Sequence, residues 1–238
     1  MDESAGQLGR RSFVLGVAGL AIATTAAGTS AAQETLTRAA GVAVLGQAAK
    51  ALCLAGTSWV LVDEDGTTYP TKGLEGATVL DVSADDRGVL AVGSRPAAVG
   101  TEATIWRSAD GITWHETMRM AGTNSEFTGV GFGPGTAMAL GSALTEERAP
   151  ARTIAARRWQ RVWTEIQVIG LEPTAEQAIT TVSGNRDGWI AASITQDGST
   201  LYRSPDGSAW TTVDAGQLED AAVQGVLLEA AGGVRWVA

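Results

Sequence analysis

The sequence predicts an all-β protein, a β-propeller of four-stranded antiparallel blades, and three observations point to this class. The string Arg-Ser-x-Asp-Gly-x-x-Trp occurs twice, at 107–114 and 203–210. Apolar segments interrupted by a polar or glycine-rich turn recur between these strings. The chain also has 30 glycines and 8 tryptophans but only 3 phenylalanines and 2 tyrosines, which favours short strands and tight turns over helices.

The turn strings belong to a repeat with a period of about 47 residues, close to the length of one propeller blade. The aromatic residues that close the successive turns are Tyr69, Trp114, Trp163 and Trp210. The full motif is present in the second and fourth copies. The first copy, VDEDGTTY, keeps only the Asp-Gly pair, and the third, RRWQRVW, keeps only the final tryptophan. The spacing therefore predicts four related units.

The segments between the turns repeat in the same order. Residues 81–94 (DVSADDRGVLAVGS) and 129–142 (GVGFGPGTAMALGS) align without a gap, and 181–193 and 225–238 follow the same pattern, the last with one inserted residue. Two short apolar stretches around a turn are typical of a β-hairpin with buried strands. Each unit is therefore expected to contain an apolar hairpin followed by two strands joined by the Asp-Gly turn.

The string Ser-x-Asp-Gly-x-x-Trp resembles the Asp-box of the sialidase and BNR-repeat families, where it joins the two outer strands of a propeller blade. Its residue types suit a turn, because Asp and Ser can bond turn amides and Gly accepts positive φ. The resemblance implies a structural role on the side away from the ligand. The residues assigned to these turns are Ser108, Asp110, Gly111, Trp114, Ser204, Asp206, Gly207 and Trp210.

The length bounds the number of blades. After a signal segment at 1–32, the chain has room for about four blades, whereas the resemblance implies six for a catalytic sialidase. Two arrangements fit: four blades closed by both termini, with the hairpin at 225–238 joined to the strand pair at 57–72, or a fragment of a larger propeller. Residues 33–54 are expected to form a helix or inner strands, and 55–238 the propeller repeats.

The first 32 residues predict export. Arg10 and Arg11 precede an uncharged apolar run that ends in small residues, and this resembles a twin-arginine signal peptide. The alternative is an uncleaved anchor, since the run from Ser12 to Ala32 approaches the roughly 20 residues that span a bilayer. We expect export by the Tat pathway to the cell envelope or outside the cell, with membrane contact only through the signal.

Net charge and the numbers of cysteine and histidine residues limit the classes of partner, cofactor and cross-link that we expect. The net charge of -9 gives no general attraction to nucleic acid. Cys53 is the only cysteine, which excludes an intramolecular disulfide and favours a buried apolar role. His115 is the only histidine and has no second His or Cys at metal-ligand spacing. We therefore expect a monomer without metal or cofactor.

Candidate binding residues lie on the loops opposite the Asp-Gly turns, where propellers hold ligands. The chargeable side chains predicted there are Arg95, Glu102, Glu146, Glu147, Arg148 and Asp197. The basic segment ARTIAARRWQRVW at 151–163 is either a solvated turn or a patch for an anionic partner, because it interleaves arginines with two tryptophans.

The sequence favours a non-catalytic, exported binding or scaffold module for an unidentified glycan or protein ligand. A glycan hydrolase of the sialidase kind, acting alone or within a longer propeller, is one alternative. It would need paired carboxylates or a tyrosine nucleophile, but Tyr69 and Tyr202 both align to the turn region. An envelope assembly factor is another alternative.

Overall fold

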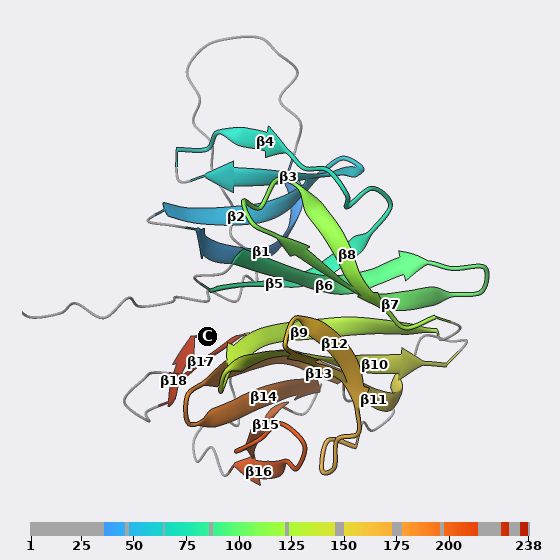
Figure 1. Cartoon of the computed structure of the whole chain (residues 1–238), viewed down its shortest axis with the longest axis vertical. Helices are drawn as coiled ribbons and strands as arrows, with labels where there is room; N and C mark the ends of the chain where they lie inside the picture. Colours follow the sequence, from blue (N-terminus) through green and yellow to red (C-terminus); the bar gives the residue numbers. More distant parts are fainter. Residues whose placement is uncertain are drawn as a thin grey trace, which may run out of the picture.

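The computed structural model describes residues 36–45, 48–63, 65–85, 88–121, 124–145, 150–172, 178–195, 198–213, 225–228 and 234–237. The regular structure in these ranges consists of β-strands. Four four-stranded sheets, here called blades 1 to 4, follow one another along the chain, and a two-stranded sheet follows them (Figure 1). Within these ranges there is no helix with the length and hydropathy needed to cross a membrane.

The strands pair in sequence order within each blade, and every pairing is antiparallel. Blade 1 contains β1 (Leu36–Leu45), β2 (Ala48–Ala55), β3 (Ser58–Asp63) and β4 (Thr68–Pro70). Blade 2 contains β5 (Thr78–Asp85), β6 (Gly88–Pro96), β7 (Thr101–Ser108) and β8 (Trp114–Arg119). Blade 3 contains β9 (Ser125–Gly133), β10 (Thr136–Leu144), β11 (Pro150–Trp159) and β12 (Val162–Ile166). Blade 4 contains β13 (Ala178–Asn185), β14 (Gly188–Thr195), β15 (Gly198–Ser204) and β16 (Thr211–Val213), and the last sheet contains β17 (Gly225–Leu228) and β18 (Val234–Val237).

The first strands of consecutive sheets contact one another: β1 contacts β5, β5 contacts β9, β9 contacts β13, and β13 contacts β17. Figure 1 shows blade 1 at the top, the other blades below it in order, and the red β17–β18 hairpin at the side. Radial repetition of four-stranded sheets through their first strands is the architecture of a β-propeller. The predicted all-β, propeller-like fold is therefore confirmed.

Each first strand carries a β-bulge at the same place. The register slips by one residue between Ala39 and Gly41 in β1, and at the matching positions in β5, β9 and β13. A bulge bends a strand and increases its twist. The residues directly after the four bulges are Gly41, Asp81, Gly129 and Thr181.

The hydrophobic cores lie between blades. One cluster joins blades 1 and 2 around Trp106, a second joins blades 2 and 3 around Phe127, and a third joins blades 3 and 4 around Trp189. Strands in the middle of a blade face a neighbour on both sides, which explains why residues 89–94 of β6 and 137–142 of β10 are buried without alternation. Cys53 is 1% exposed in a smaller cluster of blade 1, as expected, and burial raises the pKa of its thiol.

The structure differs from one of the two arrangements expected for the ends. Strands β1 and β2 lie within residues 36–55 and complete blade 1, where β2 pairs with β3. That pairing occupies the edge of β3 that the hairpin at 225–238 would need for closure. The hairpin instead forms a sheet of its own beside β13. The signal segment at 1–32, with Arg10 and Arg11, lies outside the described residues.

Candidate functional site

The turn of blade 2 is held by its own Ser and Asp side chains. The Ser108 hydroxyl donates to Asp110 Oδ1 at 2.9 Å and accepts from the amide of Gly111 at 2.8 Å. Asp110 Oδ1 also accepts from the amides of Ile112 at 2.8 Å and Thr113 at 3.0 Å. These amides, that of Thr113 first, lower the pKa of Asp110. The serine and aspartate are thus engaged within the turn that they form.

The turn of blade 4 repeats this geometry. Ser204 donates to Asp206 Oδ1 at 3.2 Å and accepts from the amide of Gly207 at 2.8 Å. The amide and hydroxyl of Ser208 both donate to Asp206 and, as the largest causes, lower its pKa to about 2. Gly207 has a φ of 82°. A left-handed backbone of this kind favours glycine.

The turn tryptophans are buried and bonded. Trp114 is 3% exposed and Trp210 is 4% exposed. Their indole nitrogens donate to the carbonyls of Gly111 at 2.9 Å and Gly207 at 3.0 Å. Each tryptophan therefore closes its turn and packs into a core shared by two blades.

Blade 1 uses a different residue for the same purpose. Asp63 occupies the position of Ser108, and its Oδ1 accepts from the amides of Asp65 at 3.2 Å and Thr67 at 2.9 Å. Its other oxygen accepts from the Tyr69 hydroxyl at 3.0 Å, and this bond is the largest cause that raises the pKa of Tyr69. The capping carboxylate has thus moved from the third position of the motif to the first.

Blade 3 replaces the motif by a two-residue turn. Residues 159–162 lie between Arg158 and its partner Trp163, one residue fewer than the 109–113 of blade 2. Gln160 and Arg161 have φ values of 46° and 75°, the positive pair that defines a type I′ turn. Trp163 keeps the buried tryptophan position at 8% exposure, as its alignment predicts.

Sequence reasoning missed a second motif that accompanies the two sharp turns. Lys72, in the linker before blade 2, donates to the Ile112 carbonyl at 2.9 Å, and its carbonyl accepts from the Trp114 amide at 2.8 Å. Ile169, in the linker before blade 4, makes the matching bonds to Ser208 and Trp210, both at 2.9 Å.

Gly-Leu-Glu follows each of these linker residues, at 73–75 and 170–172. The two copies have the same spacing as the two turns to within one residue, which is the signal that could have revealed them. Leu74 and Leu171 are each 2% exposed, so the linkers also anchor the cores between blades.

Arg95 lies against the linker between blades 1 and 2. Its guanidinium donates to the carbonyls of Gly73 and Glu75, both at 2.7 Å, and lies over the Trp106 ring with its Cζ 5.5 Å from the centroid. Its Nε is 3.3 Å from Glu116 Oε2. Arg95 therefore fastens the linker between blades 1 and 2.

Glu102 takes part in the same group of charges. Arg119 lies 3.6 Å from Glu102 Oε2 and 2.5 Å from Glu116 Oε2. The structure thus brings Arg95 and Glu102 into one network through two residues that sequence reasoning did not select. The remaining candidates lie outside the described residues: Glu146, Glu147, Arg148 and Asp197.

The histidine and one of the tyrosines considered as catalytic or metal-binding residues lie on an outer strand and in the core. His115 is exposed on β8, the outer strand of blade 2. Tyr202, one of the two tyrosines, is 7% exposed in the core between blades 3 and 4. Across the described ranges, no group of three or more His, Cys, Asp or Glu side chains is arranged to hold a metal ion.

Asp81 is the carboxylate with the largest upward shift among the described residues. It follows the bulge of β5, where Oδ1 accepts from the Val82 amide and Oδ2 from the Val130 amide of blade 3, both at 2.8 Å. Burial outweighs these two bonds and raises the pKa of Asp81 to about 7. Asp81 therefore bridges the inner strands of two blades.

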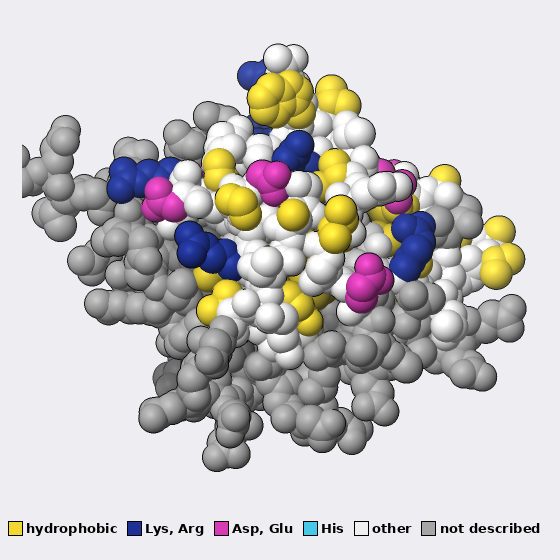
Figure 2. All heavy atoms as spheres, turned by 90° about the horizontal axis from the view of Figure 1, so that it is seen from below, with side chains coloured by type: hydrophobic (Ala, Val, Ile, Leu, Met, Phe, Trp, Pro, Cys, Tyr) yellow, Lys and Arg dark blue, Asp and Glu magenta, His cyan; other side chains and the backbone are white. Residues whose placement is uncertain are grey.

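Among the residues that the structure describes, the large hydrophobic side chains that stand exposed are Val99, Trp159, Val162 and Ile169. Among the described residues in Figure 2, hydrophobic, basic and acidic side chains are interspersed on the lower face.

Fold and turns together define a β-propeller-like protein whose blades are fastened by bonded turns and linkers. Comparison with known proteins gives no family profile that matches the sequence. No curated protein matches it either. Among solved structures, the chain is similar to one described as "YCF48 bound to D1 peptide", with 23% identity and a TM-score of 0.40. The similarity covers 60% of this chain and 40% of that chain.

Proposed function

We propose that this protein is a non-catalytic β-propeller that serves as a binding or scaffold module. The observation that carries the proposal is the state of its motif residues. Ser108 and Asp110 bond each other and accept from four turn amides, so the serine is not poised as a nucleophile. The buried Tyr202 and the bonded Tyr69 are likewise unsuited to attack a glycoside.

We further propose that the turns of blades 2 and 4 are Asp-boxes of the BNR kind. Their bonding supports this assignment, because Ser, Asp, Gly and Trp each fill the role that the turn chemistry requires. In this interpretation the two Asp-box turns maintain the fold, and the partner is bound elsewhere on the surface.

A hydrolase assay tests the non-catalytic role. The full chain is incubated with a panel of fluorogenic glycosides that includes a sialoside, and product is followed by fluorescence. We expect no turnover above the buffer blank. Turnover that is abolished by Glu147→Gln or Glu102→Gln would overturn the proposal in favour of a glycan hydrolase.

The place of action is the cell envelope or the exterior, reached by twin-arginine export. Support comes from the arginine pair and the apolar run that follows it. The test fuses residues 1–32 to a fluorescent protein that folds before export. We expect envelope fluorescence that is lost in Arg10→Lys/Arg11→Lys. Equal localisation of both fusions would contradict this proposal.

A further inference from the structure

Two of the most exposed hydrophobic side chains among the described residues lie at the end of the β11–β12 hairpin. Trp159 is 66% exposed and Val162 is 64% exposed. Trp159 and Val162 are directly opposed in the β11–β12 hairpin, so their side chains share a face. A tryptophan left in water beside other apolar groups indicates a contact surface, because its burial removes a large apolar area.

This face is continuous with the turn of blade 4. Arg157 lies two residues before Trp159 on β11, hence on the same face, and donates to the Asp206 carbonyl at 3.0 Å. We call the group Arg157, Trp159, Arg161 and Val162 the tip surface.

The turn at the tip is conformationally unfavourable. Gln160 and Arg161 are the two non-glycine residues with positive φ among those described, whereas Gly111 and Gly207 take that backbone in the turns of blades 2 and 4. Asn-Gly is the pair that suits a type I′ turn. A strained backbone that presents a charged side chain is a reason to look for a function at that position.

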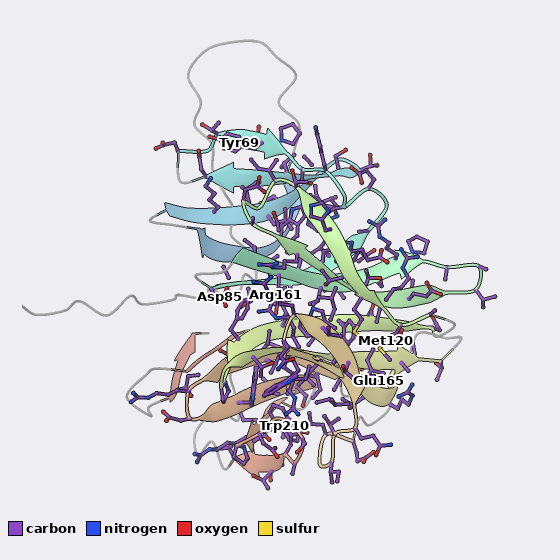
Figure 3. The ribbon with its side chains drawn as sticks, viewed as in Figure 1. Tyr69, Asp85, Met120, Arg161, Glu165 and Trp210 are labelled. Carbon is purple, nitrogen blue, oxygen red and sulfur yellow. The ribbon has the colours of Figure 1, made fainter. Side chains whose placement is uncertain are left out.

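The local charge at the tip is opposite to that of the whole chain. Arg157, Arg158 and Arg161 lie within five residues, in a chain whose net charge is -9. On β12, Glu165 lies 3.7 Å from Arg152, and in the turn of blade 4 Asp206 accepts bonds within its own turn. Figure 3 shows Arg161 and Glu165 toward opposite ends of β12.

Screening decides which kind of partner this charge favours. At physiological salt the Debye length is about 8 Å, so a short segment bound at the tip experiences mainly the arginines. An anionic bilayer extends over a far larger area and would meet more of the acidic surface. Guanidinium groups pair with carboxylates, and an exposed indole packs against an apolar side chain.

We propose that the tip surface binds an acidic protein segment that carries an apolar side chain. The carboxylates of the segment would pair with Arg157 and Arg161, and its apolar group would pack on Trp159 and Val162. This inference rests on the proposed binding role and names the partner class for it.

The probe is a fluorescein-labelled peptide of eight residues that alternates Glu and Leu, titrated with the full chain and followed by fluorescence anisotropy. We expect saturable binding with a Kd of about 100 µM or tighter, and no binding of the matched Lys and Leu peptide. Trp159→Ser is expected to weaken binding at least about tenfold.

A second variant separates binding from folding. Gln160→Asn/Arg161→Gly creates the preferred turn pair and removes a charge, so we expect a higher Tm together with several-fold weaker peptide binding. Val99→Ser, at another exposed apolar position, and Arg186→Gln, at another exposed arginine, are the matched controls and should leave Kd unchanged.

Four outcomes would overturn the inference: no peptide binding, binding unaffected by the tip variants, equal losses in the controls, or binding only to phosphatidylglycerol vesicles. The last result would assign the surface to a membrane. The glycoside assay is independent of these measurements. If the peptide does not bind and no glycoside is turned over, the proposed function of the tip surface is rejected and the general binding role is kept. If a glycoside is turned over, the non-catalytic binding role itself is rejected.

Discussion

At the scale of the residue, two kinds of carboxylate have opposite effects on stability. The hydrogen bonds that Asp206 accepts in its turn lower its pKa to about 2, so the carboxylate stays ionised. Asp81 also accepts two amides, but burial dominates and raises its pKa to about 7. The difference arises from solvent access rather than from the number of bonds.

Asp206→Asn should destabilise the fold at neutral pH and reduce its sensitivity to acid. The folded pKa lies below the unfolded value of 3.8, so the contribution is present above pH 3.8 and is lost as pH falls through about 2. Because Asp206 is exposed, we expect a loss on the order of 1 kcal/mol or less at pH 7. Denaturant unfolding at pH 7 and below pH 3 measures it, with the exposed Asp187→Asn as control. Equal losses in the two variants would contradict a specific turn bond.

Asp81→Asn should flatten the pH dependence of stability between pH 4 and 8. The folded pKa of Asp81 lies above the unfolded value of 3.8, so its favourable contribution is present below that value and is lost as pH rises through about 7. A shift of this size corresponds to about 4 kcal/mol, and the part of Asp81 that water reaches makes the effect smaller. Denaturant midpoints across this range measure it, and parallel curves for the two proteins would refute it.

At the scale of the element, the linkers before blades 2 and 4 add backbone hydrogen bonds to the two turns that carry the full motif. The Asp-Gly turns could be predicted because their bonds are local in sequence. The linker contacts could not, because Lys72 and Trp114 are distant in the chain and meet only after two blades pack. For the same reason Arg95 was predicted as a loop residue for a ligand, whereas its guanidinium bonds the carbonyls of Gly73 and Glu75.

Gly73→Ala should be strongly destabilising. Gly73 has a φ of 90°, and a Cβ at this position would lie 2.0 Å from the Trp114 carbonyl oxygen. We expect a loss of about 2 to 4 kcal/mol in the free energy of unfolding, from backbone strain and displacement of the turn. Gly76→Ala is the matched control, because its φ is 68° but no atom lies within 4 Å of the added Cβ. It should lose about 1 kcal/mol, and an equal loss in both would show that only φ matters.

At the scale of the whole molecule, the period of the repeat predicted the four blades because each blade buries its faces against its neighbours. The inner strands of blade 1 were less evident, since the aligned hairpin segments begin only at residue 81. The exposure of Trp159 could not be predicted either, because the alignment assigned the core position to Trp163 and left open where the indole of Trp159 would lie. Packing between blades, rather than within them, decides these points.

This packing predicts that a core substitution in one blade weakens its neighbour as well. Phe127 is 0% exposed in the cluster shared by blades 2 and 3, so Phe127→Ala should remove about 3 to 5 kcal/mol. Hydrogen exchange should show faster exchange in β6, β7, β9 and β10, with smaller changes in blades 1 and 4, because a repeat array couples mainly nearest neighbours. Val99→Ala, at a side chain that is 85% exposed, should change neither quantity. Loss of protection confined to blade 3 would mean that each blade is stable on its own.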